Sequence, residues 1–220
     1  MLPAGMKNIL TNKEYRAVTN RVLVSLDDLK IATNGGGSQE KITEVLSEKG
    51  IVPITVDICD EAKKLIGKEF RRGALPSEAP DTLDCSSLIK YIFGLAGVWL
   101  PRLSIQQFNH PDGEEVQLKD IHPGDIIYRK GRINRFDDDG REVGHSGLYI
   151  GNGYVIEAKN KAAGIIETSL EEFCADNVVT GVRRFIPLDS ATVTLEFPET
   201  ICIETSDDVR WIVLQGLHRQ

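Results

Sequence analysis

A cysteine at the start of an apolar helical segment constrains this chain more than any other feature. Cys85 stands in the run Asp84-Cys85-Ser86-Ser87, and the apolar residues that follow recur at helical spacing as far as Ala96. A cysteine at a helix N-terminus feels the positive end of the helix dipole and unpaired backbone N–H groups, which favour the reactive thiolate. The position indicates a nucleophile, although a free cysteine that packs as a small hydrophobic residue fits the same local sequence.

A second segment supplies a histidine that can act as the base. Residues 144–158 contain two β-rich runs around Gly151-Asn152-Gly153, which predicts a hairpin with a three-residue loop. In that register Glu157 lies opposite Gly147, and His145 lies two residues further along the same face. Diagonal neighbours of this kind are about 7 to 8 Å apart at the backbone, so the Glu157 carboxylate can orient the imidazole and stabilise its protonated form. A two-residue turn would place the two side chains on opposite faces.

Several segments, taken in order, resemble the NlpC-type papain-like cysteine peptidases, bacterial enzymes that mostly cut peptide bonds in peptidoglycan stems. The similarity extends from about Val56 to Phe185. The similar segments are residues 62–70, 84–88, 100–107, 122–128, 145–150 and 181–185. The resemblance implies an α+β papain-like fold in which a catalytic helix packs on a central antiparallel β-sheet.

The resemblance also implies a role for three residues. Cys85 is the implied nucleophile, His145 the general base and Glu157 the third catalytic residue. The implied reaction is hydrolysis of an amide in a peptidoglycan stem peptide, typically after D-glutamate, through a thioester and without a metal or other cofactor. The backbone N–H of Cys85 is the natural first oxyanion donor, because N–H groups at a helix N-terminus have no partner within the helix.

Three positions depart from the family pattern. Glu157 stands where the family usually has histidine, and sometimes asparagine or glutamine. Phe70 stands where a tyrosine hydroxyl usually helps to bind substrate or oxyanion, and Ser87 replaces a glycine. Asp84 and Ser86 match residues that help to hold the substrate in some members, although a plain helix cap explains Asp84 equally well.

These departures leave two other functions open. One is a thiol hydrolase or acyltransferase that acts on an amide or acyl substrate outside the cell wall. The other is a catalytically inactive family member that serves as a binding module, since one fold can carry several functions.

Composition argues against nucleic acid as the main partner. The chain has 26 Lys and Arg residues against 33 Asp and Glu residues, a net charge of -7, and no basic stripe along the sequence, so nucleic acid is not expected. Its four widely spaced cysteines include no Cys-x-x-Cys pair, which argues against a disulfide framework or a zinc site. No apolar run is long enough to span a membrane. The first residues lack the features of a signal peptide, which predicts a cytoplasmic protein, with non-classical export or a removed leader as the alternatives.

The sequence divides into three predicted regions. They are a mainly helical extension (1–55), the catalytic domain (56–186) and a β-rich C-terminal extension packed on the core (187–220). Within the extensions, helices are predicted over about 11–31 and 39–49, with a glycine-rich break at 34–38. Strands are predicted over 192–197, 201–204 and 209–214.

Overall fold

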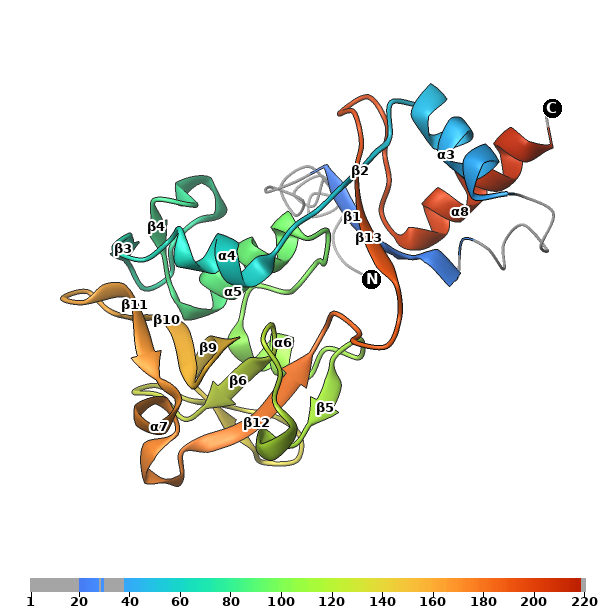
Figure 1. Ribbon diagram of the computed structural model, residues 1–220. Coiled ribbons are helices and arrows are strands. Elements are labelled where there is room, and N and C mark those ends of the chain that lie inside the picture. The colour runs from blue at the N-terminus through green and yellow to red at the C-terminus, as the bar shows by residue number, and fades with distance from the viewer. Residues whose placement is uncertain (1–19, 28, 30–37, 219–220) are drawn as a thin grey trace, which may run out of the picture.

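A six-stranded antiparallel sheet lies at the centre of the larger part of the molecule in the computed structural model, which describes residues 20–27, 29 and 38–218 (Figure 1). Its strands, in chain order, are β5 (Glu114–Val116), β6 (Ile126–Arg129), β9 (His145–Gly151), β10 (Tyr154–Asn160), β11 (Gly164–Ser169) and β12 (Val179–Arg184). Their order across the sheet is β11-β10-β9-β6-β12-β5. Every pair of neighbours is antiparallel.

Helix α5 (Cys85–Leu95) packs on one face of this sheet, and the short helix α7 (Leu170–Phe173) packs on the other. Side chains that alternate along a strand point to opposite faces. Ile126 and Tyr128 of β6 therefore join the core with α5, whereas Ile127 between them joins the core with α7. The fully buried side chains of α5 are Leu88, Ile89, Ile92 and Phe93. This helix-on-sheet arrangement confirms the predicted α+β class.

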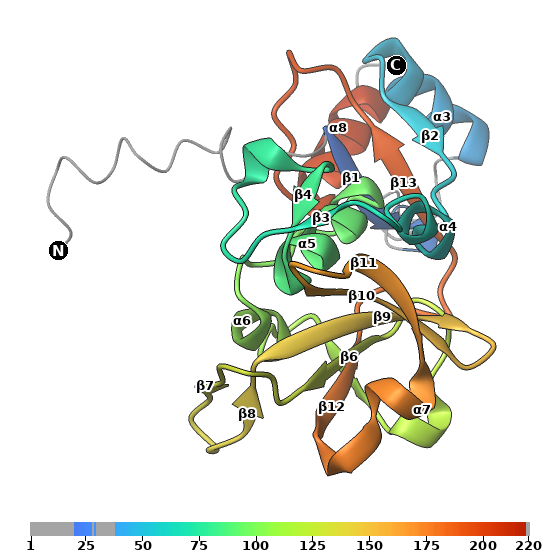
Figure 2. The ribbon, with the colours of Figure 1, turned by 90° about the vertical axis from the view of Figure 1, so that its left-hand side faces the viewer.

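Short elements surround the sheet. The helices are α4 (Ile58–Lys63) and α6 (Ser104–Phe108), and the 3-10 turns are η2 (Pro76–Glu78), η3 (Leu118–Asp120) and η4 (Ala175–Asn177). Two further strand pairs are the parallel β3 (Glu69–Phe70) and β4 (Thr82–Leu83) and the antiparallel β7 (Arg135–Phe136) and β8 (Glu142–Val143). Figure 2 shows β3, β4 and α5 above β9 and β10, with β7 and β8 below. None of the described helices combines the length and the hydrophobicity needed to cross a membrane.

The hairpin of β9 and β10 has a different turn from the predicted three-residue loop. Only Asn152 and Gly153 form the turn, and both have positive φ angles, 52° and 79°, as in a type I′ hairpin turn. A β-bulge then adds one residue to β9, after which Val155 pairs with Tyr149. The bulge restores the register that a three-residue loop would give, so the predicted His–Glu pair still shares one face.

A smaller part of the molecule combines the two ends of the chain. Strands β1 (Arg21–Ser25), β2 (Val52–Ile54) and β13 (Thr192–Glu196) form a sheet in the order β1-β13-β2, and helices α3 (Gln39–Glu48) and α8 (Ser206–Leu217) pack with it. We call these five elements the accessory unit. Its own hydrophobic core includes Val22, Val24, Leu46, Leu195 and Val213. The predicted boundaries at residues 55 and 186 stay predictions.

Some secondary-structure predictions for the chain ends are wrong. Residues 21–25 of the predicted helix over 11–31 form strand β1, in which buried Val22 and Val24 alternate with partly exposed residues. Residues 11–19, and 34–37 of the glycine-rich break, lie outside the described residues. Residues 201–204 form no strand, and 209–214 lie in α8, because Val209 and Val213 are buried one helical turn apart. The helix over 39–48 and the strand over 192–196 are confirmed.

The accessory unit binds the C-terminal end of the helix that begins at Cys85. The last carbonyls of a helix have no partners within it, and the accessory unit supplies three donors for this end of α5. The bonds are Leu23 N–H to Gly97 O (3.1 Å), Thr194 Oγ1 to Ala96 O (2.9 Å) and Arg21 Nη1 to Leu95 O (3.1 Å). Segments near the two ends of the chain thereby hold helix α5 in place.

Gly97 permits this contact, and its replacement tests it. Gly97 has a φ of +82°, and a Cβ built there would lie 2.4 Å from the carbonyl carbon of Val22. Gly67 has a similar φ of +85° but nothing within 4 Å of its built Cβ. We expect Gly67→Ala to lower the free energy of unfolding by about 1 to 2 kcal/mol through its backbone conformation alone. Gly97→Ala should lower the free energy of unfolding by the same amount and by about 1 to 3 kcal/mol more, because its new Cβ clashes with β1.

Urea denaturation of the two variants measures this difference. Equal losses of stability in Gly97→Ala and Gly67→Ala would contradict the close packing of β1 against the end of α5.

Candidate active site

Cys85 lies in a large cleft beside the edge of the main sheet. The cleft has a volume of about 1680 Å³. Residues 70–76 and the start of α5 form one wall, and residues 129–135 with the adjoining ends of β9 and β10 form the other. All six predicted site residues line it: Phe70, Asp84, Cys85, Ser86, His145 and Glu157.

Asp84 caps the helix that Cys85 begins. Its carboxylate accepts a hydrogen bond from the backbone N–H of Ser87 (2.9 Å), and the Ser87 hydroxyl accepts one from the backbone N–H of Asp84 (2.8 Å). This reciprocal capping satisfies donors that the first turn leaves free. A glycine at position 87, as in the family pattern, has no hydroxyl and could not accept this bond from Asp84.

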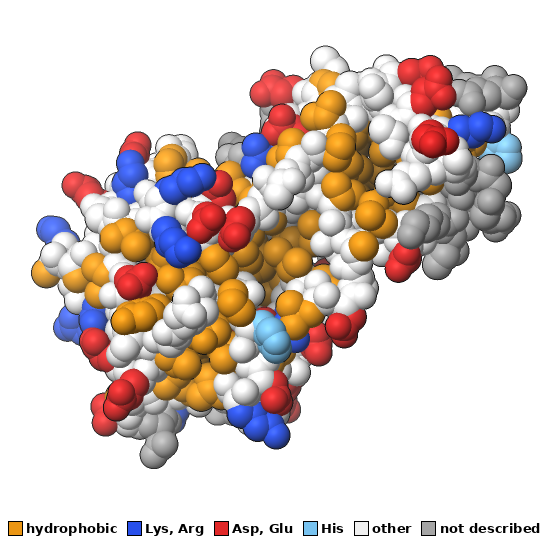
Figure 3. All heavy atoms as spheres, viewed as in Figure 1, with side chains coloured by type: hydrophobic (Ala, Val, Ile, Leu, Met, Phe, Trp, Pro, Cys, Tyr) orange, Lys and Arg blue, Asp and Glu red, His pale blue; other side chains and the backbone are white. Residues whose placement is uncertain are grey.

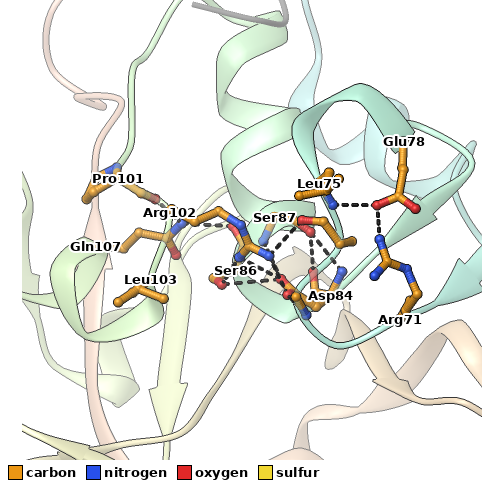
Figure 4. Close-up of polar contacts among 12 residues, drawn as sticks. Arg71, Leu75, Glu78, Asp84, Ser86, Ser87, Pro101, Arg102, Leu103 and Gln107 are labelled. Carbon is orange, nitrogen blue, oxygen red and sulfur yellow. Dashed lines mark hydrogen bonds and ion pairs between the residues drawn. The ribbon is translucent and has the colours of Figure 1, made fainter. Parts of the chain in front are cut away.

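Arg102 forms an ion pair with this cap (Figure 4). Its Nη1 and Nη2 atoms lie 2.9 and 2.5 Å from the two carboxylate oxygens of Asp84, and Nη1 also donates to the Ser86 hydroxyl at 2.9 Å. Burial raises the pKa of Asp84, but the bonds from Arg102 and from the N–H groups of Ser87 and Gly73 outweigh burial and lower it. Asp84 is therefore an ionised cap whose two oxygens both have partners.

Gln107 fixes the backbone on the other side of the same turn. Its side chain is fully buried, and its Nε2 donates to the carbonyls of Ser86 (2.8 Å) and Pro101 (2.9 Å). Arg102 and Gln107 both lie in the segment 100–107 that carries the family resemblance, but sequence reasoning assigned neither a role. The substrate-holding role of Asp84 and Ser86 stays a prediction.

His145 and Glu157 form a buried pair on neighbouring strands. The Nε2 of His145 lies 2.7 Å from the Oε2 of Glu157, and the two residues are 9% and 2% exposed. Thr168 of β11 donates its hydroxyl to the other carboxylate oxygen at 2.6 Å. Both oxygens of Glu157 are thus fixed, which fixes the orientation of the imidazole. The ring of Phe173 packs against the imidazole with centroids 5.7 Å apart.

The side chains of Cys85 and Glu157 set the charge of His145. Burial lowers the pKa of His145, because it disfavours the charged ring. Hydrogen bonds to Cys85 and Glu157, and the charges of both, outweigh burial and raise the pKa to about 9. Since Nε2 faces Glu157, Nδ1 is the ring nitrogen left for Cys85. Burial likewise raises the pKa of Glu157, but its bonds to His145 and Thr168 lower it overall.

Thr168 is a site residue that sequence reasoning missed. It belongs to β11, which pairs with β10 of the β9–β10 hairpin, and the register places it opposite Val155. Only the pairing of a third strand brings its hydroxyl to Glu157. The available signal was a threonine in a strand-like run, which is common in any β-sheet.

Phe70 and the remaining cysteines complete the account of the predicted residues. Phe70 belongs to β3, lines the cleft and packs against the main core, so it presents a ring and no hydroxyl. The four cysteines are free thiols, and Cys85 is half-buried. In the described ranges, no three His, Cys, Asp or Glu side chains are grouped as metal ligands.

Known proteins match large parts of this chain. The chain is 34% identical over 150 residues to the gamma-DL-glutamyl hydrolase of Bacillus subtilis, a match that covers 66% of this chain and 33% of that protein. It is 35% identical over 103 residues to the probable endopeptidase p60 of Listeria monocytogenes, which covers 47% and 19% of the two chains. The chain therefore spans a third or less of the length of these relatives.

A solved structure and a family model also match the chain. NlpC1 from Trichomonas vaginalis superimposes with a TM-score of 0.48 and 27% sequence identity over 58% of this chain and 42% of that one. The model of the NlpC/P60 family matches residues 67–184, more than half of the chain, including Cys85, His145 and Glu157. The chain belongs to the NlpC/P60 family.

Proposed function

We propose that this protein is a cysteine peptidase that hydrolyses an amide in peptidoglycan stem peptides, at a γ-D-glutamyl bond, with Cys85, His145 and Glu157 as its triad. One observation carries the proposal. A buried imidazole, held by a carboxylate at 2.7 Å, interacts with a cysteine at the start of a capped helix, inside a large cleft. The names of the relatives, a gamma-DL-glutamyl hydrolase and an endopeptidase, support the substrate class.

The first half of the reaction is acylation of the enzyme. The Cys85 thiolate attacks the carbonyl carbon of the amide, and the carbonyl oxygen becomes an oxyanion. The backbone N–H of Cys85 stabilises this charge, because it points out of the helix N-terminus. His145 then gives its proton to the leaving amine, the C–N bond breaks, and a thioester remains on Cys85.

The second half is hydrolysis of the thioester. Neutral His145 takes a proton from water, whose oxygen attacks the thioester carbonyl carbon. The C–S bond breaks, and Cys85 leaves as a thiolate beside the imidazolium. Throughout the cycle Glu157 keeps the ring in one orientation, and Thr168 keeps Glu157 in place.

Phe70 makes this site differ from the usual family pattern. A tyrosine hydroxyl would add a donor near the nucleophile, and one oxyanion donor is worth about 10² to 10³ in rate. With phenylalanine at this position, catalysis here depends more heavily on the backbone N–H of Cys85.

The titration of His145 tests the electrostatics of the triad. Nitrogen-15 NMR of the imidazole should give a midpoint near 9 in the wild type. Glu157→Gln should move the midpoint down, because the carboxylate favours the charged ring. Because the folded-state pKa is raised above its usual value of about 6.5, the protonated ring stabilises the fold fully below about pH 6.5 and loses this effect as the pH rises through 9.

Glu167→Gln is the matched control for this titration. Glu167 is an exposed carboxylate on β11, next to Thr168, so its neutralisation removes the same charge without touching the pair. An unchanged midpoint in Glu157→Gln, or an equal shift in both variants, would contradict the assigned pair.

Digestion of purified muropeptides tests the activity. The wild type should release fragments cut on the carboxyl side of D-glutamate, identified by mass spectrometry. Cys85→Ala should release none, and Glu157→Gln should reduce kcat by about tenfold or more, since it keeps a hydrogen-bonding group but loses the charge. Muropeptides left uncut by the wild type would refute the wall substrate, and cleavage of other thioester-forming substrates would then favour the alternative thiol hydrolase.

A further inference from the structure

The catalytic cleft is basic although the protein is acidic. Eight of the 26 Lys and Arg residues line it, but only two of the 33 Asp and Glu residues do. On the face drawn in Figure 3, by contrast, basic and acidic side chains lie interspersed. Since the chain as a whole has a net charge of -7, the excess of positive charge in the cleft is not a property of the whole chain.

The two acidic residues of the cleft do not offset this charge. Asp84 is paired with Arg102 at 2.5 Å, and Glu157 is paired with His145 at 2.7 Å. Each carboxylate therefore already has a cationic partner of its own. The cleft lining therefore contains no unpaired acidic residue that could neutralise its other basic residues.

Four basic side chains in the lining have no acidic partner. They are Arg72, Arg132, Arg135 and Lys161, all of them exposed. Within the part of the chain that the structure describes, none of the four forms an ion pair. Arg129 and Lys159 differ, since Arg129 donates to the Phe173 carbonyl at 2.5 Å and Lys159 pairs with Glu172 at 2.8 Å.

These charges lie on both sides of the catalytic histidine. The central strands run in the order β10-β9-β6, and each is antiparallel to its neighbour. The end of β10, the start of β9 at His145 and the end of β6 therefore meet at one edge of the sheet. Lys161 follows β10 on one side of His145, and Arg132 and Arg135 follow β6 on the other.

We propose that the cleft binds an anionic peptide with free carboxylates on both sides of the scissile amide, as in a γ-linked glutamyl chain. The γ-linkage in this proposal rests on the proposed function. Each γ-linked glutamate leaves its α-carboxylate free beside the backbone, so such a chain presents a carboxylate at every residue. The exposed arginines and lysine on either side of His145 would pair with carboxylates on either side of the bond that is cut.

An acidic peptide fits these observations better than a nucleic acid does. The basic residues surround a cysteine and histidine whose chemistry requires an acyl carbon, and nucleic acid offers no amide in its backbone. Two sources share the required carboxylates, a wall stem peptide with a free D-glutamate α-carboxylate and a long poly-γ-glutamate. The experiment therefore includes both.

Binding to the Cys85→Ala protein tests the proposal without any need for turnover. The ligands are a short γ-linked glutamate oligomer and the same oligomer with its α-carboxylates converted to amides, measured by isothermal titration calorimetry. We expect the carboxylate form to bind about tenfold more tightly at low ionic strength. The difference should shrink in about 1 M salt, where the screening length falls to about 3 Å.

Two double variants carry the same change of net charge. Arg132→Gln with Lys161→Gln removes one cation from each side of the cleft, and Lys41→Gln with Lys119→Gln removes two exposed lysines outside it. We expect the first pair to lose most of the preference for carboxylates and the second pair to retain it. Equal affinity for the two oligomers, no binding of either, or equal losses in the two variants would overturn the proposal.

Further titrations distinguish the stem peptide from poly-γ-glutamate as the ligand, and the proposed carboxylate binding from the proposed peptidase function. Poly-γ-glutamate and a stem tripeptide with a free D-glutamate carboxylate are titrated in the same way, and the tighter ligand identifies the source. If the wild type cleaves none of these ligands while the carboxylate preference persists, the proposed function fails and the charge inference stands. If muropeptides are cut equally well with a free and with an amidated D-glutamate α-carboxylate, the proposed function stands and only the proposed carboxylate binding fails.

Discussion

The ion pair between Asp84 and Arg102 fixes the start of the helix that carries Cys85, the proposed nucleophile. Asp84 is 6% exposed and accepts bonds from Arg102, Ser87 and Gly73, so one carboxylate joins three separate segments of the chain. Removal of one partner of a fully buried ion pair costs about 3 to 5 kcal/mol, because the other charge remains buried. Removal of Arg102, which is partly exposed, should cost less than this, but it would leave the buried Asp84 carboxylate without its cation. The position of Cys85 relative to His145, and hence the whole site, depends on this contact.

Local sequence patterns predicted the parts of the site that short-range geometry determines. The turn into an apolar helix placed Cys85 at a helix N-terminus, and the two β-rich runs placed His145 near Glu157. The predicted loop was wrong in length, but a β-bulge in β9 compensates for the missing residue. A hairpin register depends on the turn and the bulge together, and the bulge has no clear signature in one sequence.

Features that depend on long-range pairing could not be predicted. Thr168 reaches Glu157 only through a third strand, and the accessory unit forms only because β1 and β13, from opposite ends of the chain, pair with each other. The run Val209–Leu214 is apolar enough to fit a strand or a helix. It forms a helix because Val209 and Val213 then pack together into the core of the accessory unit. The basic cleft was also hidden, because its arginines and lysines are scattered along the sequence and meet only in space.

Alkylation of Cys85 by iodoacetamide across a range of pH, with the label located by mass spectrometry, tests the central claim most directly. The account predicts that Cys85 reacts faster in the wild type than in His145→Ala, most of all at about pH 6, because the protonated His145 beside it stabilises the thiolate. His145→Ala should lose the reaction at the lower pH. A rate that rises with pH as an ordinary thiol's does, equally in the wild type and in His145→Ala, would contradict the cysteine–histidine pair.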